Sequence, residues 1–382
     1  MNPNPLLFWL FWNPPREAFT IPYFNIVVVW YGILFAAGFV AGYYIFLPLL
    51  RNFLSESPQI YARDVKNWPL LASQIKNSCN ERSLPFYSAL DKQARNDLDS
   101  LSENQEPSTS LKQELLDALN VVVTDPSQSV NRKALEKIFP GAIESLCTLA
   151  SIFADRVSWF VVLGTVIGAR LGHVLFYGWD YYSQNPWEII MIRKGGLASH
   201  GGTLGIILAL TLFIRLNRKL FPEITLVKLM DLLVIPTAMT VCFIRVANFF
   251  NQEILGNPTN QPWAVIFGNA ADGSAPFPRH PVQLYEGAAY LATFAILFLM
   301  WLSKGYKRKP GVYSGLFFIL VFGSRFFIEY LKAPQSDIDR YGLQVGQWLS
   351  IPFVLLGIAL IAWPTERRSC ASCEDCASGC KN

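Results

Sequence analysis

The stretch LMDLLVIPTAMTVCFIRVANFFNQEILG, residues 229–256, decides how this sequence folds. Its first part is an apolar run long enough to cross a bilayer, which takes about 20 residues as a helix. The run ends in a cation, two asparagines and a carboxylate: Arg245, Asn248, Asn251 and Glu253. An Arg or Asp at the middle of a membrane helix costs roughly 2.5 to 3.5 kcal/mol. Several such groups kept together therefore indicate a polar site inside a membrane.

The composition also indicates a membrane protein. Hydrophobic residues make up 52% of the 382 residues and charged residues 16%, whereas a soluble domain usually has about 25% charged residues. Many of the 28 Phe, 15 Tyr and 11 Trp stand at the ends of apolar runs, as aromatic belts at membrane interfaces require. We expect membrane lipid as a partner and no nucleic acid.

Several apolar runs have the length of a membrane-spanning helix, roughly 17 to 25 residues. They lie at about 24–50, 157–178, 197–214, 229–250, 287–303, 312–331 and 346–363. We therefore expect an all-α polytopic membrane protein with about seven transmembrane helices. An odd number of spans places the two termini on opposite sides of the membrane.

Basic residues predict the orientation, because Lys and Arg are enriched in short cytoplasmic loops. They gather after the third run, after the fifth run and at the start of the tail: Arg215, Arg218, Lys219, Lys228, Lys304, Lys307, Arg308, Lys309, Arg367 and Arg368. All three places fall on one side, so the N-terminus is expected outside and the C-terminus in the cytoplasm. No charged stretch with a cleavage site precedes the first run, which is expected to act as the insertion signal.

The chain turns polar between the first two runs, from about residue 51 to 155. Apolar residues spaced three and four apart predict a helix over Asp91–Leu119, punctuated at Pro107, and a shorter helical stretch over 130–139. We expect a helical cytoplasmic insertion that either has no chemistry of its own or binds a partner. The expected domains are 1–50 with span one, the insertion 51–155, spans two to seven at 156–365, and a Cys-rich cytoplasmic tail at 366–382.

Five glycines surround His200 in the segment GGLASHGGTLG, residues 195–205. Glycine lets a backbone approach a ligand closely, and imidazole titrates near neutral pH, which suits a base at the entrance of a span. The same residues also fit close helix packing and a structural histidine. The segment alone leaves both interpretations open.

Several spaced motifs together resemble the signatures of the prolipoprotein diacylglyceryl transferase family. The longer ones are H-G-G at 200–202, R-x-A-N-F-F-N-x-E-x-x-G at 245–256 and R-H-P-x-Q-L-Y-E at 279–286. The shorter ones are W-Y-G at 30–32, R-L-G at 170–172, Asp231, and R-F-x-x-E at 325–329. The resemblance covers all seven runs in order and leaves out only the insertion and the end of the tail.

The resemblance implies a transferase of the bacterial inner membrane whose active site faces the outer leaflet. The diacylglyceryl group of phosphatidylglycerol passes to the lipobox cysteine thiol of a prolipoprotein, and glycerol phosphate leaves, as the first step of lipoprotein maturation. The implied partners are phosphatidylglycerol and lipobox peptides, and no cofactor is expected. The alternative is a non-enzymatic phospholipid carrier or scramblase, which would also keep polar groups in the bilayer.

This chemistry needs a base or a positive field that favours the thiolate, since a free cysteine thiol has a pKa of about 8.5. It also needs fixed cations at the departing phosphate, whose negative charge grows in the transition state. By the resemblance, Arg245 and Arg325 bind that phosphate, a task that suits the planar guanidinium. Arg325 also stands four residues before Glu329, a spacing that predicts a salt bridge. His200 completes the catalytic set as the expected base, with His280 as its rival.

The resemblance also implies a substrate-binding set: Tyr31, Arg245, Asn248, Glu253, Gly256, His280, Arg325 and Glu329. Asn248 either hydrogen-bonds the glycerol headgroup or packs between helices. Glu253 either orients Arg245 or binds headgroup hydroxyls, and Gly256 gives a turn where a side chain would crowd the lipid. Tyr31 either donates to a phosphate or ester oxygen or lies at the membrane interface.

The chain departs from the family pattern at two positions. The glycine expected before the motif arginine is Ile244, and the tyrosine expected one turn before Arg325 is Val321, beside Phe322. The first change predicts different local helix packing. The second removes a phenol, so a mechanism that needs a hydroxyl at that position is in doubt for this chain.

Four of the seven cysteines form C-x2-C-x2-C-x3-C at the end of the chain: Cys370, Cys373, Cys376 and Cys380. This spacing is that of a bacterial iron–sulfur run without its proline, and four thiolates can also hold zinc. However, a two-cluster ferredoxin needs a second run, which the sequence lacks. We assign no metal site and keep these cysteines as candidates beside the interpretation of an unstructured or lipid-adjacent tail.

Overall fold

The computed structural model describes residues 9–23, 26–57, 59–78, 85–102, 104–125, 130–191, 196, 198–303, 308–334 and 342–363, with the backbone only at Tyr177, Ser199 and His200. The chain forms two compact units, one of Met1–Gly38 with Thr237–Asn382 and one of Phe39–Pro236. The boundaries fall inside two helices, α1 (Trp30–Ser55) and α9 (Leu226–Phe250). Each of these helices therefore contributes one end to each unit.

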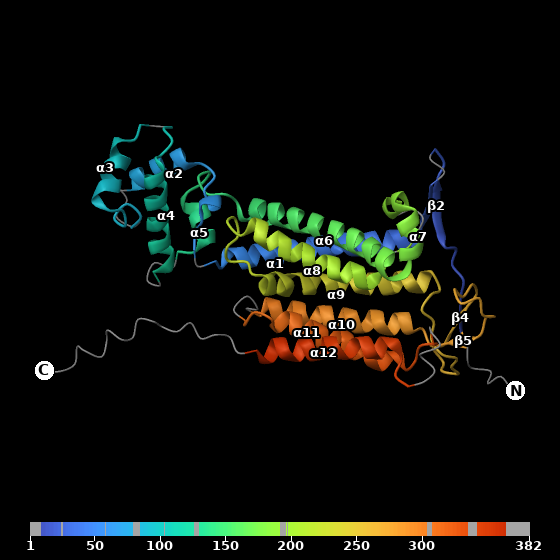
Figure 1. Ribbon diagram of the computed structural model, residues 1–382. Helices are drawn as coiled ribbons and strands as arrows, with labels where there is room; N and C mark the ends of the chain where they lie inside the picture. Colours follow the sequence, from blue (N-terminus) through green and yellow to red (C-terminus); the bar gives the residue numbers. More distant parts are fainter. Residues whose placement is uncertain are drawn as a thin grey trace. The chain divides into compact units, whose positions relative to one another are not determined.

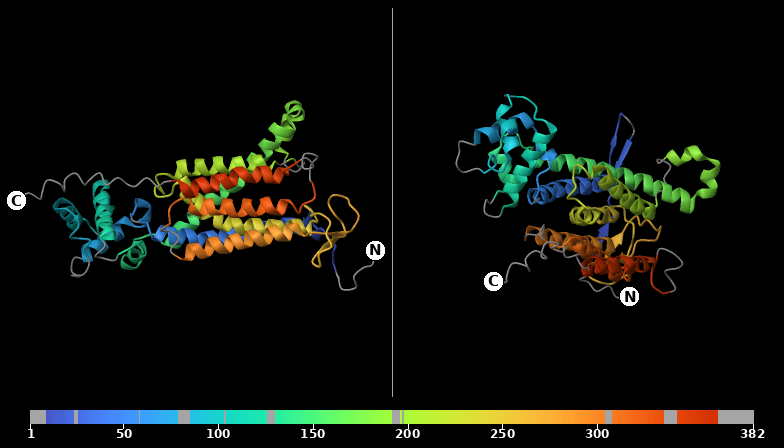
Figure 2. Two further views of the ribbon diagram at one scale, coloured as in Figure 1. Left: turned by 90° about the horizontal axis from the view of Figure 1, so that it is seen from below. Right: turned by 60° about the vertical axis from the view of Figure 1, so that its left-hand side comes forward.

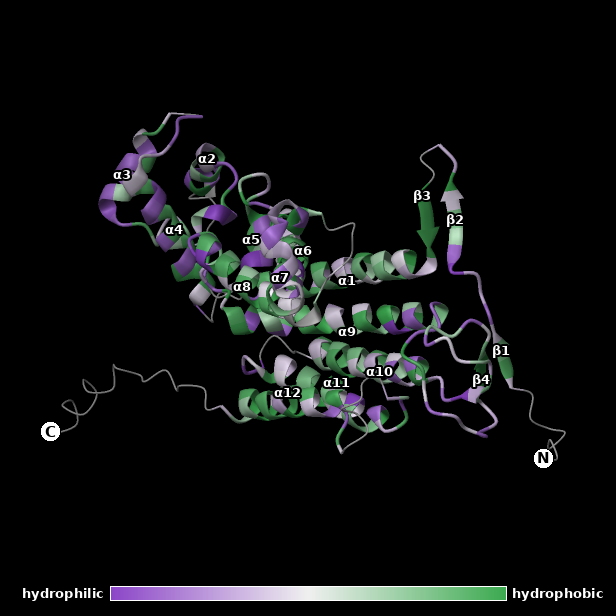
Figure 3. Cartoon of the chain, turned by 45° about the vertical axis from the view of Figure 1, so that its right-hand side comes forward, coloured by the Kyte–Doolittle hydropathy of each residue, from purple (hydrophilic) through white to green (hydrophobic). Residues whose placement is uncertain are grey.

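Six helices in the described part of the chain are long and apolar enough to cross a membrane. They are α1, α6 (Leu146–Tyr177), α9, α10 (Val282–Leu302), α11 (Val312–Glu329) and α12 (Val345–Ala362). The third expected span corresponds to α8 (Ser199–Asn217), which is apolar over its fully described residues 201–217. Figure 3 shows these helices coloured mainly as hydrophobic. The expected helical, multi-pass membrane protein is confirmed, while the number of spans and their orientation stay predictions.

Short strands, which the apolar runs did not predict, accompany the helices. β2 (Glu17–Ile21) and β3 (Ile26–Val29) pair antiparallel, labelled in Figure 3. The apolar run predicted to be helical from about residue 24 thus begins as a strand, because consecutive β-branched side chains favour extended backbone. A second sheet has the order β1-β4-β5, with β1 (Leu10–Trp12) parallel to β4 (Val265–Phe267) and β5 (Pro278–Arg279) antiparallel to β4.

In the unit that contains the C-terminal helices, α11 packs against both α10 and α12. These helices, coloured orange to red, run along one another in Figures 1 and 2. The sheet joins this unit through Trp12, whose ring stacks on Phe249 with centroids 4.7 Å apart. The indole Nε1 of Trp12 also donates to the carbonyl of Phe249 at 3.1 Å. Strand β1 is therefore fixed to the end of α9, where the Arg245 motif lies.

In the other unit, glycines bring α6 and α8 into backbone contact. Added to Gly168 of α6, a β-carbon would lie 2.4 Å from the carbonyl oxygen of Gly201 and 2.7 Å from the Cα of Gly205. Only glycine permits such an approach, as in small-xxx-small contacts of membrane helices. Gly201 and Gly205 thus serve close helix packing, while the role of His200 stays open.

The insertion folds around a hydrophobic core of its own. Its helices are α2 (Trp68–Ser78), α3 (Lys92–Ser100), α4 (Thr109–Thr124) and α5 (Arg132–Ile138). The helix predicted over Asp91–Leu119 is therefore two helices, because the chain breaks at the punctuation around Pro107. Asp91 and Ser108 cap the two starts by accepting from the N–H groups of Ala94 and Leu111.

One arginine ties the insertion to the connection between α8 and α9 within the same unit. Arg63, in the short 3-10 helix η1 (Ala62–Asp64), pairs with the Glu223 carboxylate and donates to the carbonyl of Leu220. Its guanidinium also lies 4.3 Å from the ring centroid of Phe221. The boundaries assigned to the insertion and to the other domains stay predictions.

Candidate functional site

The polar end of α9 is built around Arg245. The Nε of Arg245 lies 2.9 Å from Oε2 of Glu286 on α10. One terminal nitrogen of Arg245 donates to Oδ1 of Asn248 at 3.1 Å, one turn further along α9. The Asn248 amide in turn donates to the Glu253 carboxylate. Glu253 therefore acts on Arg245 through Asn248, and these three predicted site residues form one hydrogen-bonded chain.

Glu286 is fully buried between two cations. Its Oε1 lies 2.9 Å from the Nζ of Lys332, which is itself 2% exposed. The same Nζ lies 2.7 Å from Oε2 of Glu329. Buried charges persist only when they are paired, and here each charge has at least one partner. The buried ion network Arg245–Glu286–Lys332–Glu329 thus joins the ends of α9, α10 and α11.

Glu329 pairs with Lys332 rather than with the arginine one turn before it. Among the described residues, no ion pair joins Glu329 to Arg325, although their spacing predicted one. Lys332 lies between the two buried carboxylates and satisfies both, which accounts for the difference. A β-carbon on Gly346, in the first turn of α12, would lie 2.1 Å from Oε1 of Glu329. The carboxylate therefore fits only because residue 346 is glycine.

The loop after α9 contains two residues in the left-handed region. Gln252 has a φ of 53° and Ile254 a φ of 57°, which is uncommon without glycine and strained for a β-branched side chain. Between them stands Glu253, turned back toward Asn248. The buried Gln252 side chain holds the turn by accepting from the N–H of Asn269 at 2.7 Å.

Gly256 meets backbone rather than open space. A β-carbon there would lie 2.2 Å from the carbonyl oxygen of His280. Gly256 also forms a β-bridge with Lys332, and the Leu255 carbonyl accepts from the N–H of Ala333 at 3.0 Å. This backbone pairing places Lys332 where it reaches the buried carboxylates.

Tyr31 and Arg325 lie beside the same network. Tyr31, the second residue of α1, is partly buried and interacts electrostatically with Glu253 and Arg245. Arg325 is partly buried on α11 and interacts electrostatically with the side chain of Tyr290 on α10. Tyr290 also lies beside Arg245, whose Cζ is 5.9 Å from the centroid of the Tyr290 ring. The two arginines predicted to bind phosphate therefore share one aromatic neighbour.

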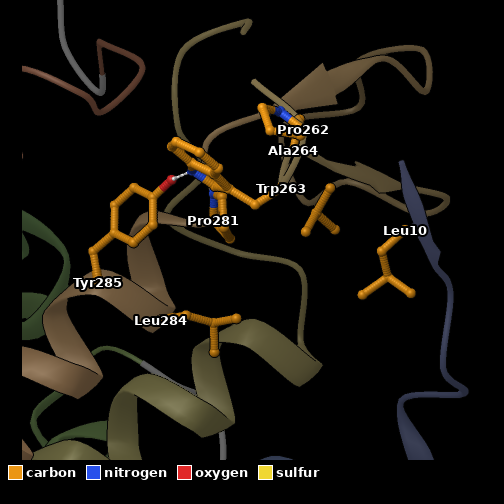
Figure 4. Close-up of a pocket in the computed structure, with 8 residues that line it drawn as sticks. Leu10, Pro262, Trp263, Ala264, Pro281, Leu284 and Tyr285 are labelled. Carbon is orange, nitrogen blue, oxygen red and sulfur yellow. Dashed lines mark hydrogen bonds between the residues drawn. The ribbon is translucent and has the colours of Figure 1, made fainter. Parts of the chain in front are cut away.

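His280 lies outside the network, beside an apolar cavity. Its Nδ1 is 3.2 Å from the hydroxyl of Tyr285, which accepts from Nε1 of Trp263 at 2.7 Å, and partial burial lowers the pKa of His280. Tyr285 and Trp263 line a cavity of about 590 Å³ (Figure 4). None of its lining residues is charged: Leu10, Pro262, Trp263, Ala264, Val265, Pro281, Leu284 and Tyr285. The cavity thus offers no cation to a phosphate.

His200 belongs to the unit of Phe39–Pro236, and its side chain lies outside the described residues. The backbone that leads to it is held by Arg170 of α6, which is 4% exposed. Arg170 donates to the carbonyls of Glu188 at 2.6 Å, Ile189 at 2.8 Å and Gly196 at 3.1 Å. These carbonyls belong to the 3-10 helix η2 (Pro186–Ile190), which follows α7 (Trp179–Gln184), and to the segment before α8. The assignment of His200 as the base stays a prediction.

Two members of the site, Tyr290 and Lys332, have no role assigned from the sequence, and Glu286 enters there only as the last residue of the motif at 279–286. Helical spacing could have indicated both, because Tyr290 stands four residues after Glu286 and Lys332 three residues after Glu329, and residues at these spacings are neighbours on a helix. Cys370, Cys373, Cys376 and Cys380 lie outside the described residues. In the part of the chain that the structure describes, no group of three or more His, Cys, Asp or Glu side chains is placed to hold a metal ion.

Comparisons with known proteins point to one family. The family model described as prolipoprotein diacylglyceryl transferase matches residues 143–363. A phosphatidylglycerol--prolipoprotein diacylglyceryl transferase of Protochlamydia amoebophila is 46% identical over 356 residues, 93% of this chain and 95% of the relative. A relative with the same name in Tolumonas auensis is 48% identical over 56% of this chain and 80% of the relative. Another, in Chloroherpeton thalassium, is 43% identical over 53% of this chain and 73% of the relative.

The extent of these matches differs in an informative way. The Protochlamydia match covers 93% of this chain, which is possible only if most of residues 51–155 are included. The other two matches cover 56% and 53% of the chain. The insertion is therefore shared with at least one relative.

Proposed function

Because the chain belongs to the prolipoprotein diacylglyceryl transferase family, we propose that it transfers the diacylglyceryl group of phosphatidylglycerol to the lipobox cysteine thiol of prolipoproteins. It acts in the bacterial inner membrane, with its site towards the outer leaflet. The observation that carries this proposal is the buried ion network at the ends of α9, α10 and α11. Such a network is costly in a membrane, so its presence indicates a site for a polar substrate.

Arg245 and Arg325 supply the field that binds the phosphate. Fixed cations stabilise the departing phosphate more than the bound lipid, because the negative charge on the phosphate increases as it leaves. Glu286 holds Arg245 from one side and Asn248 from the other, so the guanidinium is oriented before the lipid arrives. Carboxylates also balance the cations of the site, which limits the cost of burying them.

The reaction forms a sulfur–carbon bond and breaks a carbon–oxygen bond. His200 takes the thiol proton, and the thiolate attacks the glycerol carbon that bears the phosphate ester. The electron pair of the broken bond leaves with glycerol phosphate. Asn248 and Glu253 bind headgroup hydroxyls, Tyr31 donates to a phosphate or ester oxygen, and Arg170 fixes the backbone that precedes His200.

A transfer assay with purified protein, phosphatidylglycerol and a lipobox peptide tests this proposal. Mass spectrometry of the peptide and release of glycerol phosphate should report equal amounts of both products. We expect Arg245→Ala and Arg325→Ala to lose nearly all transfer, and His200→Gln to lose activity and change its pH dependence. Arg95→Ala, in the insertion, is the control and should remain active.

The same preparation separates the enzyme from a lipid carrier or scramblase. If fluorescent phosphatidylglycerol crosses the bilayer of reconstituted vesicles while no peptide becomes lipidated, the transferase proposal is wrong. Retention of transfer by Arg245→Ala would refute the role of the network even if the wild-type protein is active. Retention by His200→Gln with an unchanged pH profile would move the base to another residue.

A further inference from the structure

This chain has no phenol at the position where the family resemblance implies one. The tyrosine expected one turn before Arg325 is Val321, a buried residue of α11. A phenol that takes its place beside the phosphate-binding arginines therefore comes from another helix.

Helix α10, which packs against α11, brings a phenol to these arginines. Tyr290 is 3% exposed and lies one turn after Glu286, on the same face of α10. The Cζ of Arg245 lies 5.9 Å from the centroid of the Tyr290 ring. The Tyr290 phenol interacts electrostatically with Arg245, with Arg325 and with Glu286.

The phenol beside Arg245 has a proton to donate. A guanidinium has donors and no acceptor, so the O–H of Tyr290 cannot donate to Arg245 and is available to another group. Buried tyrosine hydroxyls usually find an acceptor. Beside Tyr290, a phosphate oxygen held by Arg245 and Arg325 would be such an acceptor.

We propose that Tyr290 replaces the missing phenol: its hydroxyl, on a ring that lies beside Arg245, donates a hydrogen bond to a phosphate oxygen of the bound phospholipid. The bond strengthens as the phosphate gains charge on leaving, because hydrogen bonds to charged acceptors are the stronger ones. Tyr290 would thus be a catalytic residue that reaches the site from α10 instead of α11. This inference rests on the proposed diacylglyceryl transfer.

The test compares three variants in the transfer assay. Tyr290→Phe keeps the ring and should lower the rate about 10- to 100-fold, as expected for a lost hydrogen bond to a charged group. Tyr290→Phe combined with Val321→Tyr should regain most of that loss, because it restores the hydroxyl beside Arg325. Tyr313→Phe is the control, since Tyr313 is equally buried but lies about 18 Å from Arg325 along α11.

Two results of the transfer assay would overturn the role proposed for Tyr290. A rate for Tyr290→Phe within about twofold of wild type overturns the proposal, because a lost charged hydrogen bond costs more. A loss that Val321→Tyr does not restore also overturns it, since the hydroxyl then serves packing alone. Native mass spectrometry with phosphatidylglycerol separates the two proposals. If the wild-type protein lipidates no peptide, the proposed function fails. Weaker binding of phosphatidylglycerol by Tyr290→Phe than by wild type would still support the phosphate contact, and equal binding by the two proteins would refute it.

Discussion

Replacing Gly201 by alanine should force α6 and α8 apart. The new β-carbon would lie 2.2 Å from the carbonyl oxygen of Gly168 and 2.7 Å from the Cα of Gly172. Ordinary contacts begin at 3.4 Å, so the space is about 1.2 Å too short. Both neighbours are backbone atoms, so a side-chain rotation cannot relieve the clash and the helices must move.

This geometry indicates how much stability Gly201→Ala should lose. Overpacking typically destabilises a protein by about 1–3 kcal/mol. We expect a value in the upper half of this range, because the atoms that the new carbon meets belong to the backbone. A loss of about 2–3 kcal/mol corresponds to a melting temperature lower by about 2–4 °C in a protein of 382 residues. Transfer should fall further, since Gly201 follows His200 directly and a displacement of about 1 Å can cost about 100-fold in rate.

Gly202 provides the matched control on the same helix. A β-carbon on Gly202 would meet its nearest neighbour, the Cβ of Ala169, at 3.5 Å, which is ordinary contact. Thermal unfolding in detergent and the transfer assay should therefore separate Gly201→Ala from Gly202→Ala. If the two variants unfold at the same temperature as wild type, the backbones of α6 and α8 do not touch and the reasoning is refuted.

Three further changes test the site and its surroundings. Lys332→Met leaves Glu286 and Glu329 without their shared cation, so unfolding should be easier by about 3–5 kcal/mol; a wild-type melting curve would contradict this. Gly346→Ala displaces the Glu329 carboxylate, whose Oε1 would be 2.1 Å from the new carbon, and transfer should fall about tenfold; an unchanged transfer rate would show that the position of this carboxylate does not matter. Burial lowers the pKa of His280 from 6.5, so its contribution to stability is complete above pH 6.5 and is lost as the pH falls through the folded-state value. Melting temperatures measured between about pH 7.5 and 5 should therefore fall less in His280→Gln than in wild type; parallel curves would show that His280 is not responsible.

Most of the fold followed from local properties of the sequence. The last four long helices begin or end within a few residues of the predicted apolar runs, because a bilayer fixes both their length and their composition. The strands did not follow, since the partner of β1 lies far away in the chain and a three-residue strand carries little periodic signal. The start of α1 was misplaced because hydropathy cannot separate an apolar strand at 26–29 from the helix that continues it.

The site was predicted where polar groups interrupt apolar runs. Arg245, Asn248 and Glu253 stand out for that reason, and the structure joins them. Lys332 and Tyr290 did not stand out, because a lysine in a loop and a tyrosine in a span are ordinary until their burial and partners are known. Partner choice comes from tertiary structure, which a single sequence does not reveal.

The left-handed backbone at Ile254 has a consequence for engineering. A β-branched residue in that conformation costs on the order of 1–3 kcal/mol, and glycine would release this cost. A stability screen would therefore favour glycine at position 254. The looser loop would hold Glu253 less firmly against Asn248, so the selected protein would be more stable to heat and would have a lower turnover rate. Thermal robustness and turnover are thus opposed at this one peptide unit.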